Sequence, residues 1–343
     1  MRSKQQLLVL LVLLMAVWAC KKADDLNLIE FAGFTKPGHF PEPTYSFAIT
    51  PLSQETFELG RKLFHDGILS RDNTISCASC HISQNAFTHH GHDVSHGIDD
   101  QLGIRNSSAL INLAWSASFF WDGGVQQLDL TPMVPIHNPI EMDENMENVV
   151  KKLQAHAKYP MLFKQAFGTE NITSTQVFKA LSHFMVMLVS DNSKYDKVKR
   201  NEATFTTEEA SGYQIFQSKC NTCHQEPLFT DHSFRDNGLG INPAKDLGRY
   251  DITSSEEDKL KFKVPTLRNL HYTAPYMHDG RIITLEGVLN HYAKEVVHTD
   301  NLDPLLKQNK GIPLRANEMQ DLLAFLNTLN DESFVNNKAF NQP

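Results

Sequence analysis

The chain has 343 residues and a formal net charge of −8 at pH 7, with 41% hydrophobic and 21% charged residues. After the N-terminal segments described next, about 290 residues remain, which is enough for two domains with cores of their own. The negative charge argues against nucleic acid as a partner.

Residues 1–20 have the pattern of a secretory signal. A basic start is followed by an apolar run over residues 7–17, which is short for a membrane span. The run ends in a sequence similar to a bacterial lipoprotein cleavage box, in which Cys20 is lipidated; an ordinary signal peptide and an uncleaved anchor are the alternatives. We therefore expect a periplasmic or cell-envelope protein that is attached to the membrane only by a lipid at Cys20. Residues 21–50 are predicted to form a tether and a surface strap.

The pattern C-x-x-C-H occurs twice, at Cys77–His81 and Cys220–His224. It is the attachment signal of a c-type haem, in which two cysteines bond to the haem and the histidine supplies an axial nitrogen to iron. Zinc half-sites are the alternative, but no cysteines remain to complete them. We predict two covalent haems and redox chemistry. The attachment residues are Cys77, Cys80, His81, Cys220, Cys223 and His224.

The segments before the two motifs resemble each other. Each begins like a capped helix and then carries G-x-x-x-F, at Gly60–Phe64 and at Gly212–Phe216. Each half also ends in an apolar stretch with helical spacing, at 177–189 and at 319–329. The same order of features ahead of each C-x-x-C-H motif indicates an internal repeat.

The repeat predicts a mainly α fold with two cytochrome c-like helical haem domains. We expect the first domain at 51–200, the second at 201–332 and a tail at 333–343. Segments rich in Pro, Gly, Asn and Asp are predicted to be long loops that wrap the haems. These segments are 66–76, 82–107, 131–148 and 231–250.

Further motifs follow in a fixed order along residues 50–330, and with them the sequence resembles the bacterial di-haem cytochrome c peroxidase family. It also resembles that family's offshoot, the di-haem enzyme that matures methylamine dehydrogenase. The motifs are CASCH, Ala86-Phe87-Thr88, Gly103-Ile104-Arg105-Asn106, Phe120-Trp121-Asp122-Gly123, Glu141-Met142, CNTCH, Val264-Pro265-Thr266-Leu267-Arg268-Asn269 and Pro275-Tyr276-Met277-His278-Asp279-Gly280.

The resemblance implies roles for residues near the first haem. Trp121 stands where the family has a tryptophan that relays electrons between the haems, although a buried core tryptophan is the structural alternative. Glu141 stands where the family has a glutamate that moves a proton during peroxide cleavage; a surface glutamate at a helix start is the alternative. Pro135 is expected to line the same pocket. Thr131 replaces a family glutamine that contacts peroxide.

The resemblance also implies one calcium ion. Asn106, Thr273 and Pro275 stand where the family binds an interdomain calcium, and an amide oxygen with backbone carbonyls suits that hard cation. A turn asparagine and a rigid proline corner are the structural alternatives.

Axial ligation separates branches of the family. Fourteen residues after His278, where ordinary peroxidases have a methionine that caps the second haem, this chain has Tyr292, as the maturation enzyme does. Met277 or His291 are alternative sixth ligands. A phenolate lowers the potential of the iron, whereas a thioether raises it. We expect the first iron to be open, with ligation by His96 as the alternative.

These features favour a peroxidase that reduces hydrogen peroxide to water. The expected electron donor is a small redox protein such as a cytochrome c or a cupredoxin. A maturase-like enzyme, which oxidises residues of a partner protein through a high-valent two-haem state, is the first alternative. A non-catalytic di-haem electron carrier is the second. A homodimer is possible in such a family.

Overall fold

The computed structural model describes residues 31–48 and 50–343. The predicted signal segment and the lipidation candidate Cys20 lie outside the described residues. Within the described part, no helix has both the length and the apolar character needed to cross a bilayer.

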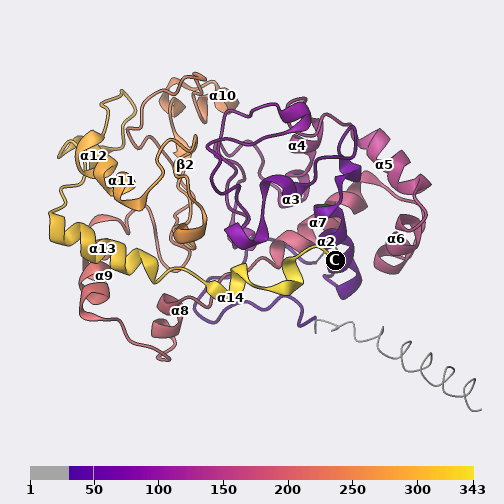
Figure 1. The fold of residues 1–343 in the computed structure, drawn as a ribbon, viewed down its shortest axis with the longest axis horizontal. Helices are drawn as coiled ribbons and strands as arrows, with labels where there is room; N and C mark the ends of the chain where they lie inside the picture. The colour runs from indigo at the N-terminus through magenta and orange to yellow at the C-terminus, as the bar shows by residue number, and fades with distance from the viewer. Residues whose placement is uncertain (1–30, 49) are drawn as a thin grey trace, which may run out of the picture. The chain divides into compact units, whose positions relative to one another are not determined.

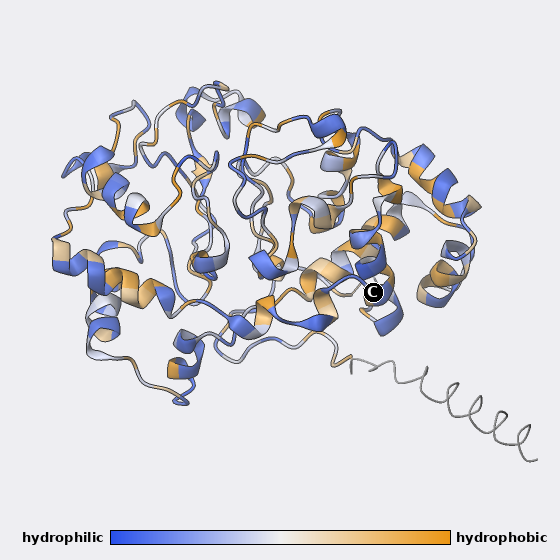
Figure 2. Cartoon of the chain, viewed as in Figure 1, coloured by the Kyte–Doolittle hydropathy of each residue, from blue (hydrophilic) through white to orange (hydrophobic). Residues whose placement is uncertain are grey.

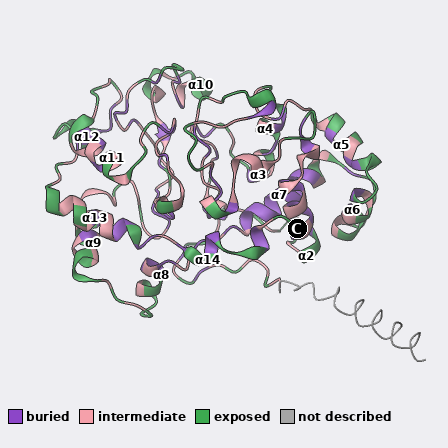
Figure 3. Cartoon of the chain, in the orientation of Figure 1, coloured by how far each residue is buried: buried purple, intermediate pink, exposed green. Residues whose placement is uncertain are grey.

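Two helices pair closely in the N-terminal half of the chain (Figure 1). Helix α2 (Gln54–His65) packs along α7 (Ser174–Val186), and both helices begin with a capping box. A Cβ atom at Gly60 would overlap the main-chain oxygen of Ala180, so this close approach requires a glycine. Helix α7 is buried along most of its length (Figure 3) and forms the centre of this half.

The C-terminal half repeats this arrangement. Helix α9 (Thr207–Lys219) packs along α13 (Ala316–Asn327), and a Cβ atom at Gly212 would overlap the main-chain oxygen of Asp321. The glycines of the two G-x-x-x-F motifs therefore have the same structural role, because each lets one helix backbone approach another closely. This equivalence agrees with the predicted internal repeat.

The remaining elements are short and are joined by long irregular segments. Strands β1 (Phe234–Arg235) and β2 (Phe262–Lys263) form an antiparallel pair with Phe234 opposite Lys263. Most helices carry both hydrophilic and hydrophobic residues (Figure 2), as expected for helices that have one face on a core. The mainly α prediction is confirmed. The other helices are α3 (Cys77–Cys80), α4 (Met133–His137), α5 (Met146–Ala155), α6 (Tyr159–Phe167), α8 (Lys194–Lys199), α10 (Tyr250–Thr253), α11 (Leu285–Asn290), α12 (Pro304–Lys307) and α14 (Glu332–Val335).

All four segments predicted as loops contain short regular elements, which in 66–76 and 82–107 are three-residue 3-10 helices. Helix α4 lies inside 131–148, and strand β1 lies inside 231–250. Both elements are very short, because the Pro, Gly, Asn and Asp residues around them favour turns. The segments therefore remain mostly irregular.

Residues 33–48 of the predicted strap are irregular and contact the N-terminal half. The N–H of Tyr45 donates to the carbonyl of Ala114 at 3.0 Å. The indole Nε1 of Trp115 donates to the carbonyl of Pro41 at 2.8 Å. Main-chain groups of the strap are thus paired with groups of the folded chain.

The predicted tail, residues 333–343, returns to the first half. Phe334 and Phe340 both lie against the ring of Phe87, with ring centroids 5.9 and 6.1 Å apart. All three rings are buried. The tail therefore contributes to the core around α2 and α7.

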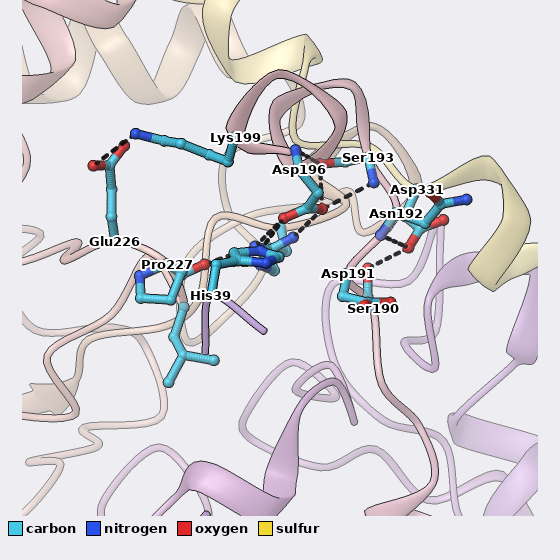
Figure 4. Close-up of polar contacts among 12 residues, drawn as sticks. His39, Ser190, Asp191, Asn192, Ser193, Asp196, Lys199, Glu226, Pro227 and Asp331 are labelled. Carbon is cyan, nitrogen blue, oxygen red and sulfur yellow. Dashed lines mark hydrogen bonds and ion pairs between the residues drawn. The ribbon is translucent and has the colours of Figure 1, made fainter. Parts of the chain in front are cut away.

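A buried ion pair joins distant parts of the chain. Both terminal nitrogens of Arg268 donate to the carboxylate of Asp196 at 2.8 Å, and neither side chain is exposed. His39, from the strap, lies 2.9 Å from the same carboxylate (Figure 4). Arg268 also donates to the carbonyl of Pro227. This network ties the strap, α8 and the VPTLRN segment together.

Candidate functional site

A cavity of about 1140 Å³ contains both C-x-x-C-H segments in its wall. It exceeds the roughly 300–1000 Å³ that is usual for one small-molecule site. All four motif cysteines have free thiols, which thioether attachment requires. The residues fit two covalently attached haems. The motif residues in the wall are Cys77, Cys80, His81, Cys220, Cys223 and His224.

The two motif histidines are oriented by backbone carbonyls. The Nδ1 atom of His81 lies 2.8 Å from the carbonyl oxygen of Phe87. The Nδ1 atom of His224 lies 3.2 Å from the carbonyl of Phe229 and 3.1 Å from that of Pro265. A carbonyl only accepts hydrogen bonds, so Nδ1 carries the proton in each ring and Nε2 keeps its lone pair. Each imidazole is therefore set up to give Nε2 to a metal.

The zinc alternative gains no support from the geometry. Across residues 31–48 and 50–343, no three His, Cys, Asp or Glu side chains gather in an arrangement that would hold a metal ion. A structural zinc site usually needs four such ligands.

Glu141 lines the cavity close to the first motif. Burial raises the pKa of its carboxyl group, and a hydrogen bond from Asn138 opposes that rise. Burial, and then the charge of Glu141, raise the pKa of the Cys80 thiol to about 11. The carboxyl group is therefore near Cys80, in surroundings that favour its protonated form.

Two further expected residues share this wall of the cavity. Pro135 lines it, and the Pro135 carbonyl accepts a hydrogen bond from the N–H of Met142 at 3.2 Å. Thr131 also lines the cavity, but its hydroxyl donates to the carbonyl of Leu128 at 2.8 Å. The threonine hydroxyl is thus engaged with its own backbone.

Trp121 stands in the cavity wall where the two halves of the chain meet. Its carbonyl accepts a hydrogen bond from the N–H of Lys263, in β2, at 2.7 Å. Beside it, Arg105 forms a two-pronged ion pair with Asp246, at 2.6 and 2.8 Å, and also pairs with Asp122. Since all three charged side chains are largely shielded from solvent, the junction around the indole is held rigidly.

Tyr292 lines the cavity beside the second motif. It lies in a turn of π-helix, η8 (His291–Glu295), a rare form that is often found at functional sites. Burial raises the pKa of Tyr292 to about 12, and the charges of Cys223 and Cys220 contribute to the rise. The phenol is therefore close to the second attachment site.

The alternative sixth ligands have different positions. Met277 lines the cavity, and its sulfur accepts a hydrogen bond from Asn237 at 3.5 Å. His291 is not part of the wall among the described residues, and its Nε2 lies 3.0 Å from the carbonyl oxygen of Asn237. This geometry disfavours His291 and leaves Tyr292 and Met277.

Asn237 is a residue that the sequence analysis missed. Its side chain hydrogen-bonds the Tyr292 phenol as well as the Met277 sulfur. Its Oδ1 accepts from the N–H of Leu239 at 3.2 Å, which turns the amide NH2 toward the two candidate ligands. The F-x-x-N-G spacing at 234–238 is the only local signal for it.

The three expected calcium ligands, Asn106, Thr273 and Pro275, all line the cavity. The side-chain Nδ2 of Asn106 donates to the carbonyls of His92 and Asp93, both at 3.1 Å. This orientation leaves Oδ1 as the free atom of the amide. Thr273 and Pro275 line the same cavity, and no hydrogen bond among the described residues uses their carbonyl oxygens.

His96 does not belong to the described cavity wall, although Ser95 and Gly97 on either side of it do. Its Nδ1 lies 2.9 Å from the Asp100 carboxylate, and its Nε2 lies 3.2 Å from His92. In this arrangement His96 is engaged outside the cavity.

The fold and the site define the class of the protein, which is a c-type cytochrome with two haem attachment sites in one cavity. A family model described as "Di-haem cytochrome c peroxidase" matches residues 54–204. The chain is 34% identical to the methylamine utilization protein MauG of Methylorubrum extorquens over 90% of this chain and 86% of that protein. It is 33% identical to the cytochrome c551 peroxidase of Nitrosomonas europaea over 82% of each chain.

The chain is also similar to a solved structure. It is a MauG-like protein associated with microbial copper homeostasis, and it matches 91% of this chain and 99% of its own with a TM-score of 0.84 and 32% identity. The chain belongs to the di-haem cytochrome c peroxidase family. The resemblance inferred from the ordered motifs is thereby confirmed, as are the oxidoreductase class and two c-type haems.

Proposed function

We propose that this protein reduces hydrogen peroxide to water with electrons from a small redox protein. A bound c-type haem supplies iron that exchanges electrons and binds peroxide. The observation that carries the proposal is one cavity that contains both attachment motifs, a half-buried carboxyl group beside the first motif and an indole at the junction. The long segments that line this cavity are proposed to wrap the haems.

Glu141 is proposed to move the proton. Its carboxylate takes a proton from one peroxide oxygen and returns it to the departing oxygen, so that two electrons and two further protons yield two waters. Burial raises the pKa of this carboxyl group, which makes it a better proton acceptor than an exposed carboxylate. Pro135 and its neighbours in the wall keep bulk water from competing for the carboxylate.

Trp121 is proposed to relay electrons from the second half of the chain to the first. Its backbone link to Lys263 and the ion pairs of Arg105 hold the indole at the junction. Tyr292 is proposed to cap the second haem, with Met277 as the alternative. The domain boundaries near residues 200 and 332 are part of the same proposal, because each haem then has its own helix pair.

Calcium is proposed to bind between the Asn106 side-chain oxygen and the carbonyls of Thr273 and Pro275. Elemental analysis of the purified protein should find one calcium per chain in the wild type and much less in Asn106→Ala. Full calcium retention in the variant would refute the assignment.

Attachment to the cell envelope by a lipid at Cys20 is proposed from the sequence alone. Cys20→Ser should release the protein from the membrane fraction, and an unchanged distribution would rule out the anchor. A homodimer also remains a proposal, which sedimentation of the purified protein tests.

The deciding experiment uses stopped-flow mixing of the purified di-haem protein with peroxide. General acid–base groups contribute roughly 10²–10⁴-fold to rate. Glu141→Gln keeps the size of the side chain but loses the base, so the reaction with peroxide should slow by that order while haem content stays normal. A wild-type rate in this variant would show that Glu141 is only a structural residue.

A maturase-like function is the second candidate, and the position of Tyr292 beside Cys220 and Cys223 favours it. A phenolate ligand stabilises oxidised iron, which suits an enzyme that oxidises a partner protein. Steady turnover of peroxide with a reduced small cytochrome supports the peroxidase. Peroxide consumption that depends on a partner protein, with residues of that partner oxidised, would support the maturase.

A further inference from the structure

The backbone of Gly97 lies directly against the backbone that carries Glu141. A Cβ atom at Gly97 would overlap the carbonyl oxygen of Ile140 and would lie 2.5 Å from the Cα of Glu141. The backbone φ at Gly97 is −108°, which any L-residue can adopt. The contact with residues 140 and 141, not the backbone conformation, therefore requires glycine here.

A hydrogen bond extends this contact. The N–H of Ile98, a fully buried residue, donates to the carbonyl of Glu141 at 2.8 Å. On the opposite side of Gly97, the carbonyl of His96 lies 3.5 Å from the sulfur of Cys80. Residues 96–98 thus lie between the first attachment motif and the backbone of Glu141, in contact with both.

The Glu141 side chain has few interactions that fix its position. No ion pair among the described residues involves its carboxylate, and its side-chain partner is Asn138. The position of the carboxylate is consequently set by its backbone. That backbone is held by Ile98 on one side, and the next residue, Met142, is held by the N–H of Arg71 at 2.9 Å.

We propose that Gly97 is a positioning residue for peroxide cleavage: its bare backbone sets how far the Glu141 carboxylate stands from Cys80 and the first haem site. The proposal rests on the proposed role of Glu141. Any side chain at residue 97 would push the 140–141 peptide away. A misplacement of about 1 Å can cost about 10²-fold in rate.

The test is Gly97→Ala in the full-length di-haem protein, mixed with peroxide in a stopped-flow instrument. We expect a loss of about 10²-fold in the rate constant, with normal haem content and an unchanged second-haem signal in electron paramagnetic resonance. Gly38→Ala is the matched control, because a Cβ atom there has nothing within 4 Å, and it should react at the wild-type rate.

A double-variant cycle shows whether Gly97 acts through Glu141. In a Glu141→Gln background, Gly97→Ala should cost little further, because the group that it misplaces is already gone. Equal losses in both backgrounds would overturn the Gly97 proposal alone. A wild-type rate in Glu141→Gln would overturn the role of Glu141 and, with it, this proposal. Loss of haem in Gly97→Ala would make the glycine a folding residue and would also overturn it.

Discussion

The indole Nε1 of Trp121 donates a hydrogen bond to the main-chain carbonyl of Asn106, 2.9 Å away. The side-chain amide of the same asparagine holds the carbonyls of His92 and Asp93. One residue therefore joins the proposed electron relay to the proposed calcium site. A change at either site is expected to reach the other through this hydrogen bond.

Replacing Trp121 with phenylalanine tests the relay. Trp121→Phe should leave the first reaction with peroxide nearly intact but slow electron delivery from the second haem by about tenfold or more. Stopped-flow mixing resolves the two steps. Trp115→Phe is the control, since the indole of Trp115 also donates to a carbonyl, at 2.8 Å, but Trp115 is not part of the described cavity wall. Equal slowing in both variants would show that only packing is affected.

The sixth ligand of the second haem can be read from spin state. Tyr292→Phe should convert a low-spin ferric signal to a high-spin one in electron paramagnetic resonance, because the iron loses a ligand. If the spectrum stays unchanged and Met277→Ala removes the low-spin signal instead, the methionine is the ligand.

Asn237 should influence how strongly the Tyr292 oxygen donates electrons to the second haem iron. Asn237→Leu removes a hydrogen bond to the phenol oxygen, which makes the oxygen a stronger electron donor and should lower the midpoint potential of the second haem. Spectroelectrochemistry measures the shift. In a Tyr292→Phe background the same substitution should have no effect, and a shift that persists there would contradict a role through Tyr292.

Acid stability should depend on His183, a fully buried residue of α7 whose Nδ1 lies 2.8 Å from the Thr56 hydroxyl. Burial, with the charge of Lys179, lowers the pKa of His183 to about 4, whereas an unfolded histidine titrates near 6.5. The unfolded state therefore binds a proton first, so stability falls as the pH drops from about 6.5 to 4.

The measurement is the free energy of unfolding against pH. His183→Asn should flatten the slope in this window by at most about 1.4 kcal/mol per pH unit, which corresponds to one proton. The variant can be less stable overall without affecting the test. An unchanged slope would show that other groups dominate, such as His89, whose pKa is also lowered to about 4.

The buried pair of Arg268 and Asp196 should be costly to break. Burial alone would raise the pKa of Asp196, but the Arg268 guanidinium lowers it to about 2, so the carboxylate stays charged down to low pH. Arg268→Met removes the buried guanidinium and leaves His39 and Ser193 as partners of that charge, so it should destabilise the protein by about 3–5 kcal/mol.

Chemical denaturation of the haem-containing protein measures this loss of unfolding free energy. The double variant Arg268→Met, Asp196→Leu should recover part of it, because no unpaired buried charge remains. Lys151→Met breaks an exposed pair with Glu147 and should leave the denaturation midpoint unchanged. A double variant less stable than the single one would contradict the argument.

The sequence by itself determined what is encoded locally. C-x-x-C-H places two thiols and an imidazole within five residues, so haem attachment can be predicted without knowing the fold. Gly60 and Gly212 each begin a G-x-x-x-F motif ahead of a C-x-x-C-H motif, and this repeat predicted two equivalent helix pairs. The ordered motifs also predicted the family and brought attention to Glu141, Trp121 and Tyr292.

The tertiary structure decided what depends on distant segments. Gly97 looks like any loop glycine until the 140–141 peptide packs on it, 43 residues away in sequence. Asn237 meets the candidate ligands Met277 and Tyr292 only because two later segments of the chain fold back to it. Arg268 and Asp196 are separated by 72 residues and pair only when both are buried. Such contacts follow from chain packing, which no local pattern encodes, so they could be found only in three dimensions.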